Sequence, residues 1–245
     1  MKNKKGELTT TQLVTLIVLI VSFIIILFLI FRLNLGKTTD AEICKNSVVL
    51  KGQSSLPSGP INCKIGYLCI SGGQDCQDFS ASEKISVDST KTQIMTALAN
   101  SMSNCWFEFG EGKINYGTST TNNVYYAICS IISFDKTIQD KTSQISYQEF
   151  YTFLQQTKKD DTQTYLHYLY GINDVSQFSS QPQVQISLSQ DRILTNGKYS
   201  VVTGIANSYV GIISSKSDAF LKVYIIPTSE TSSRLQSGGE FITKA

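Results

Sequence analysis

An unbroken apolar run from Leu13 to Phe31 constrains this chain more than any other feature of its sequence. The run holds 19 residues without a charge, and at ~1.5 Å per residue it would form a helix roughly 28 Å long. The hydrocarbon core of a bilayer is about 30 Å thick. Apolar residues occupy every face of such a helix, so it has no polar side with which to lie on a globular surface. The sequence therefore predicts a transmembrane helix over residues 13–31.

The residues that flank this run predict its orientation. Lys2, Lys4 and Lys5 precede it, whereas Arg32 and Lys37 follow it. Basic residues stay on the cytoplasmic side, which places residues 1–12 inside the cell and the chain from about residue 33 outside. A cleaved secretory signal has a shorter apolar stretch and a small-residue cleavage site, so we expect an uncleaved signal-anchor. A buried helix of a soluble core is the alternative.

Six cysteines follow the apolar run, and an even number outside the membrane indicates disulfides. They are Cys44, Cys63, Cys69, Cys76, Cys105 and Cys129. Zinc is the competing interpretation, but the chain has no CxxC or HxxxH spacing and only one histidine, His167. We therefore expect no metal and no cofactor.

The part of the chain beyond the apolar run is long enough for a substantial core and carries little charge. Residues 38–245 hold 16 Lys and Arg against 18 Asp and Glu, a net charge of −2. No basic run interleaves with aromatic residues, so we expect no nucleic-acid partner. The predicted organisation is a stalk over 32–43, a cysteine-rich section of short strands over 44–82, an α+β ectodomain over 83–227 and a polar tail over 228–245.

Hydrophobic periodicity predicts the first ectodomain helix and the strand after it. Ile94, Leu98, Met102 and Cys105 recur at helical spacing after a cap at Asp88 or Ser89, and Gly110 ends the pattern. The apolar, β-branched run from Val124 to Phe134 predicts a buried strand that contains Cys129. We predict a disulfide between Cys105 and Cys129. The connectivity of the other four cysteines stays open, because four cysteines permit three pairings.

Further elements follow from caps, turns and periodicity. Ser146 and Glu149 have the spacing of a capping box that begins a helix, and a shorter helix ends before Gly171. Strands are predicted at 48–50, 65–70, 183–189, 199–206, 209–214 and 220–226, with a hairpin turn at Asn196-Gly197. The predicted fold class is α+β: a transmembrane helix followed by a disulfide-stapled mixed helix and sheet domain outside the cytoplasm.

Few residues carry recognisable chemistry, and we assign no catalytic residue. His167 lies in a tyrosine-rich helical turn without a nucleophile motif, which favours a packed or surface histidine. Glu108 and Glu111 flank Gly110 beside Trp106, where paired carboxylates could act on a glycan as acid and base. Three residues apart at a helix end, they are more typical of a solvated cap. A hydrolase therefore stays the third functional hypothesis.

Aromatic residues supply the candidate interaction sites. Tyrosine and tryptophan are enriched at binding hot spots, which singles out Tyr165, Tyr168, Tyr170 and Trp106. Packing in the core is the competing interpretation. If the tyrosine cluster lies on the surface, Tyr168→Ala should weaken partner capture without lowering the melting temperature.

Two resemblances extend this interpretation. Lys4-Lys5-Gly6-Glu7 before an apolar helix resembles the class III signal of type IV pilin-like proteins, which implies cleavage between Gly6 and Glu7. Thr11 stands where those proteins usually carry a glutamate. The wider chain, at 106–113, 127–129 and 164–171, resembles uncharacterised single-pass membrane proteins of archaea, which implies a cell-surface location and no established activity.

The favoured function is a membrane-anchored surface domain that binds a protein partner or contributes to an envelope assembly. A pilin-like filament subunit that self-associates through its first helix is the alternative. In both cases membrane lipid is the expected partner of residues 13–31.

Overall fold

The computed structural model describes residues 10–32, 40–53, 61–117, 124–180, 192–206, 220–235 and 239–243. The chain divides into two compact units, residues 1–39 and residues 40–245. The described residues of the first unit form helix α1 (Thr10–Arg32), and a helix is what the apolar run predicts. Gly6 and Glu7, the residues of the predicted cleavage site, lie outside the described residues.

The second unit combines helices and strands in the following order. Its elements are α2 (Asp40–Gln53), β1 (Gly66–Ser71), β2 (Glu83–Ser86), α3 (Lys91–Glu108), the short 3-10 helix η1 (Gly110–Gly112), β3 (Val124–Phe134), α4 (Lys136–Lys141), β4 (Gln144–Ser146), α5 (Tyr147–Gln156), α6 (Tyr165–Tyr170), η2 (Val175–Ser180), β5 (Arg192–Leu194), β6 (Tyr199–Ala206), β7 (Phe220–Pro227), α8 (Thr228–Leu235) and β8 (Gly239–Phe241). The predicted α+β class is confirmed for this unit.

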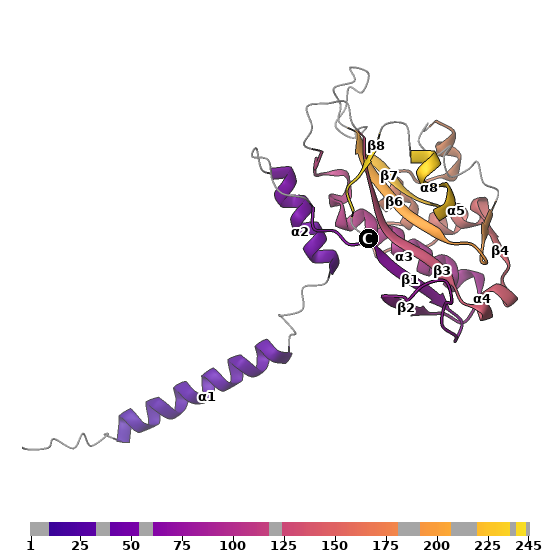
Figure 1. Ribbon diagram of the computed structural model, residues 1–245. Coiled ribbons are helices and arrows are strands. Elements are labelled where there is room, and N and C mark those ends of the chain that lie inside the picture. Colours follow the sequence, from indigo (N-terminus) through magenta and orange to yellow (C-terminus); the bar gives the residue numbers. More distant parts are fainter. Residues whose placement is uncertain are drawn as a thin grey trace, which may run out of the picture. The chain divides into compact units, whose positions relative to one another are not determined.

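A mixed sheet forms the centre of the second unit, with the strands ordered β2-β1-β3-β6-β7 (Figure 1). β1 runs parallel to both β2 and β3, whereas β3, β6 and β7 are antiparallel neighbours. β8 pairs in parallel with the first residues of β3. β4 and β5 form a separate two-stranded sheet. The C-terminal ends of the parallel strands β1 and β3 therefore lie beside each other.

Helix α3 packs its apolar face against β3, β6 and β7 and also contacts α2, α5 and α6. Ile94, Leu98, Met102 and Cys105 on that face are at most 1% exposed, as their spacing predicts. The helix begins slightly later than expected, because Thr90 rather than Asp88 or Ser89 caps it by accepting a hydrogen bond from the Gln93 amide. Burial of this face joins the helical layer to the sheet.

Three disulfides connect the six cysteines. The predicted bond between Cys105 in α3 and Cys129 in β3 is confirmed. Cys44 pairs with Cys63 and Cys69 pairs with Cys76, which resolves the connectivity that the sequence left open. The bonds join α3 to the sheet, α2 to the chain that leads into β1, and β1 to the loop that follows it.

The structure corrects the predicted strand at residues 48–50, because α2 covers them. Cys44 and Val48 are buried whereas Asn46 between them is exposed, a pattern that fits a helix and not a strand, in which all three side chains would share one face. Acidic residues in the first turn and Lys51 in the last favour the helix dipole. Burying Cys44 and Val48 on one face of a helix therefore outweighs the preference of the Val48-Val49 pair for a strand.

Two other expectations differ from the structure. The turn at Asn196-Gly197 exists, but it is not a hairpin, because β5 pairs with β4 while β6 pairs with β3 and β7. The predicted polar tail over 228–245 contains two regular elements, α8 and β8. The strands predicted at 183–189 and 209–214 lie outside the described residues.

Within the residues that the structure describes, no helix meets the combined requirements of length and hydropathy for crossing a membrane. The predicted span over 13–31 is therefore not supported by that measure.

Candidate functional site

The most unusual backbone of the second unit is the Gly110-Glu111-Gly112 turn that follows α3. All three residues have positive φ angles, of 78°, 56° and 70°. Glycine adopts this region without strain, and a Cβ on Gly112 would approach the Trp106 ring to 3.0 Å. Glu111, in contrast, adopts an angle that is uncommon for a residue with a side chain. The turn thereby directs the Glu111 carboxylate toward α6.

Both oxygens of the Glu111 carboxylate accept hydrogen bonds from the chain itself. Tyr168 Oη in α6 donates to Oε1 at 2.9 Å, and Lys113 Nζ donates to Oε2 at 2.8 Å. Burial opposes ionisation, but these bonds and the charges of Lys113 and Lys45 hold the pKa of Glu111 below its usual value. Glu111 is therefore an ionised carboxylate that links η1 to α6.

The pKa of Glu108, the other member of the predicted carboxylate pair, is shifted in the opposite direction. Burial raises its pKa to about 7, and the negative charge of Asp40 in α2 adds to this shift. The two carboxyls thus ionise in different pH ranges, as acid and base residues do in glycosidases. Neither residue lines either of the two cavities described below.

Lysine side chains lie over the Phe107 ring of α3 and the Tyr168 ring of α6. Lys45 Nζ is 3.2 Å from the Phe107 ring centre, and Lys159 Nζ is 4.2 Å from that of Tyr168. Cations over aromatic faces are favourable by about 0.5–2 kcal/mol each. These contacts attach α2 to α3 and the loop after α5 to α6.

The residues proposed as interaction sites divide between the core and the surface. Trp106, Tyr165 and Tyr170 are only 4%, 6% and 2% exposed, so they pack in the core. Tyr165 Oη donates to Asn100 Oδ1 at 2.6 Å, which ties α6 to α3. Tyr168 is partly exposed. Of these four residues, Tyr168 alone keeps a side chain that a partner could contact.

Two tyrosine hydroxyls bind the outer side of strand β7. Tyr170 Oη donates to the Val223 carbonyl at 2.7 Å, and Tyr147 Oη donates to the Ile225 carbonyl at 2.9 Å. Val223 lies at the irregularity in the pairing of β6 with β7, where it has no partner residue in β6. The two tyrosines therefore satisfy buried backbone acceptors of β7.

We expect Tyr170→Phe to lower the free energy of unfolding by about 1–3 kcal/mol, because the buried Val223 carbonyl loses its donor. Tyr168→Phe should cost less than about 1 kcal/mol, because its bond to Glu111 is only partly buried. Urea denaturation of both variants measures this difference. Equal losses would contradict the assignment of Tyr170 to the core and Tyr168 to the surface.

A buried carboxylate that the sequence analysis did not single out lies at the C-terminal ends of β1 and β3. Asp135 is 1% exposed and accepts hydrogen bonds from the amides of Gly72, Gln74 and Ile138 and from the Ser71 hydroxyl, at 2.7–3.0 Å. Aspartate directly after a strand is a favoured cap for a following helix, and this signal could have identified it. Its acceptor positions are filled by the chain, which makes it a structural clamp.

The cavities of the described residues include two that are lined mostly by polar side chains. The larger, of about 460 Å³, lies between the start of α3 and α5. The smaller, of about 270 Å³, is lined by His167 together with Lys158, Asp161, Thr162, Gln163, Thr164 and Asn173. His167 is exposed, in agreement with a surface histidine. Across the described ranges no group of three His, Cys, Asp or Glu residues could hold a metal ion.

Comparison with known proteins provides no relative: no family model, no curated protein and no solved structure matches this chain.

Proposed function

We propose that this protein is a membrane-anchored domain that operates outside the cytoplasm and binds a protein partner or contributes to an envelope assembly. The observation that carries the proposal is the pairing of one apolar helix with a separate unit that contains three disulfides. Disulfides persist in oxidising compartments and are rare in the cytosol. In this proposal helix α1 attaches the chain to the membrane, and the second unit provides the surface that binds the partner.

Helix α1 supports the anchor through the environment of its side chains. Its large apolar residues are about half exposed or more, from Leu13 at 48% to Leu19 at 63%. Exposed apolar area on this scale is costly in water and favourable in lipid. The side chains of residue 27 and residues 29–31, which complete the apolar run, lie outside the described part of the chain.

Filament formation is the second candidate, and the same exposed helix favours it. Apolar side chains on all faces of α1 allow it to pack against copies of itself as well as against lipid. Amino-terminal sequencing of the mature protein separates the two candidates. A chain that begins at Glu7 supports the filament subunit, whereas an intact terminus supports the uncleaved anchor.

We expect the full chain to sediment with membranes and to resist extraction at alkaline pH. Val18→Lys combined with Ile24→Lys should release it, since each lysine at the centre of a span costs about 2.5–3.5 kcal/mol. The matched control, Val18→Leu with Ile24→Leu, should stay in the membrane fraction. Recovery of the unmodified chain in the soluble fraction would contradict the anchor.

Orientation and compartment need a separate measurement. In right-side-out cells or vesicles, external protease should digest a tag at the carboxyl terminus and leave one at the amino terminus intact. If all six cysteines form disulfides, the denatured chain should not react with a thiol-alkylating reagent until a reductant is added, and electrophoresis should show the shift in mass only after reduction. A protected carboxyl-terminal tag, or free thiols throughout, would place the second unit in the cytoplasm.

A further inference from the structure

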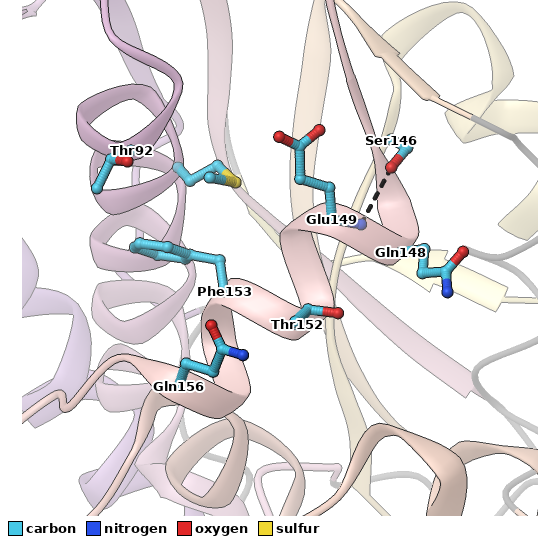
Figure 2. A pocket seen from close by; sticks show the side chains of 8 residues that line it. Thr92, Ser146, Gln148, Glu149, Thr152, Phe153 and Gln156 are labelled. Carbon is cyan, nitrogen blue, oxygen red and sulfur yellow. Dashed lines mark hydrogen bonds between the residues drawn. The ribbon is translucent and has the colours of Figure 1, made fainter.

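The larger cavity is a groove between the amino-terminal end of α3 and helix α5. Eight residues line it: Thr92, Met95, Ser146, Gln148, Glu149, Thr152, Phe153 and Gln156. Figure 2 shows the Phe153 side chain reaching from α5 toward the helix that carries Thr92, with Gln156 one turn further along α5. Its volume of about 460 Å³ is within the range of roughly 300–1,000 Å³ for small-molecule sites.

Uncharged hydrogen-bonding groups dominate this groove. Thr92, Gln148 and Gln156 are exposed, and Thr152 is partly exposed. Among the residues that the structure describes, the side chains of Gln148, Thr152 and Gln156 have no protein hydrogen-bond partner. These amides and the hydroxyl are therefore available to a ligand.

Charge in the groove is balanced. The one carboxylate of the lining, Glu149, accepts hydrogen bonds from Lys91 Nζ at 3.0 and 3.1 Å. An anionic ligand would meet this carboxylate, and a cationic ligand would have to displace Lys91 from it. The electrostatics therefore favour a ligand without net charge.

The apolar part of the groove is small and includes one aromatic ring. Phe153 is partly exposed, whereas Met95 is only 6% exposed. An aromatic face is electron-rich and attracts the polarised C–H groups of a sugar ring. Amides and hydroxyls around such a ring can bind the sugar hydroxyls, which both donate and accept.

We propose that this groove binds a neutral saccharide, with a sugar ring on Phe153 and its hydroxyls bonded to Gln148, Thr152 and Gln156. A peptide is disfavoured because α3 and α5 supply most of the lining, and helices do not offer the open strand edge on which an extended peptide adds a strand. The site is independent of the anchor, since all its residues belong to the second unit.

The test uses the full chain in phosphatidylcholine nanodiscs, because detergents with sugar headgroups would occupy the groove. Saturation-transfer-difference NMR is recorded with four neutral disaccharides: cellobiose, maltose, mannobiose and chitobiose. We expect transfer to at least one of them, reduced fivefold or more in Gln156→Ala and in Phe153→Leu. Gln53→Ala, which removes an exposed amide on α2, is the matched control and should leave the signal unchanged.

Thermal melting followed by circular dichroism distinguishes a loss of sugar binding from a loss of folding in the groove variants. Gln156 is exposed, so Gln156→Ala should fold and melt like the unmodified chain. Absence of transfer to all four disaccharides overturns the proposal. Transfer that survives both groove variants also overturns it, as does displacement of the bound sugar by an equimolar uncharged peptide.

Discussion

Replacing Asp135 by alanine should lower the free energy of unfolding by about 3 kcal/mol or more. The substitution removes the acceptor of three backbone amides and one hydroxyl at a position that is 1% exposed. A buried or partly buried donor left without its acceptor costs about 1–3 kcal/mol. The loss should be measurable by urea denaturation, with the midpoint lowered and the slope unchanged.

Asp140→Ala is the control for this prediction, because Asp140 is exposed and pairs with Lys136 on the surface of α4. It should cost less than about 0.5 kcal/mol. A loss for Asp135→Ala as small as that of the control would show that water replaces the carboxylate without penalty.

The same carboxylate predicts a pH dependence of stability. Although burial opposes ionisation, the backbone hydrogen bonds hold the pKa of Asp135 below its usual value. An aspartate with a depressed pKa stabilises the fold fully above the unfolded pKa of about 3.9, and this contribution is lost as the pH falls through the folded pKa. The difference in stability between the unmodified chain and Asp135→Ala should therefore shrink below about pH 4. A constant difference down to pH 2 would contradict this account.

Removing the disulfide between Cys105 and Cys129 should have the second large effect. The bond joins residues 24 apart in sequence, for which loop entropy predicts a loss of about 3.5 kcal/mol when both cysteines become alanine. Both side chains are also buried, at 1% and 8% exposure, so lost packing adds to the effect. Denaturation of the double variant without reductant measures the change.

The Cys69–Cys76 bond provides an internal comparison, because it joins residues only seven apart. Its removal should cost about 2.5 kcal/mol by the same relation. The order of the two losses is the decisive result. A larger loss from the short loop would show that native packing, not the constraint on the unfolded chain, determines what these bonds contribute.

Sequence reasoning recovered the elements whose signals are local. The spacing of Ile94, Leu98, Met102 and Cys105 predicted α3 and its buried face, and the apolar run over 124–134 predicted β3 with its exact bounds. Ser146 caps α5 as expected, by accepting a hydrogen bond from the Glu149 amide at 3.0 Å. Gly171 ends α6 with a φ of 72°, as the left-handed cap requires.

Features that depend on distant residues could not be derived in this way. Helix α2 replaces a predicted strand because Cys44 and Val48 are buried in the fold, which no local propensity reveals. Strand β5 pairs with β4, which precedes it by more than 40 residues, and not with its neighbour β6. Tyr165 and Tyr170 could not be separated from Tyr168, because their burial depends on α3 and β7. The groove beside Phe153 has no sequence signature, since its walls come from two separate helices.

The hydroxyls of Tyr147 and Tyr170 bear on whether strand β7 can pair with a strand of another chain. An exposed strand with open carbonyls is a template on which a neighbouring chain can add its own strand and begin an aggregate. On β7, the acceptors at Val223 and Ile225 are already taken from within the molecule. A second chain could therefore pair with β7 at these positions only after the two tyrosines had been displaced from buried sites, so the packing that stabilises the fold also protects the strand.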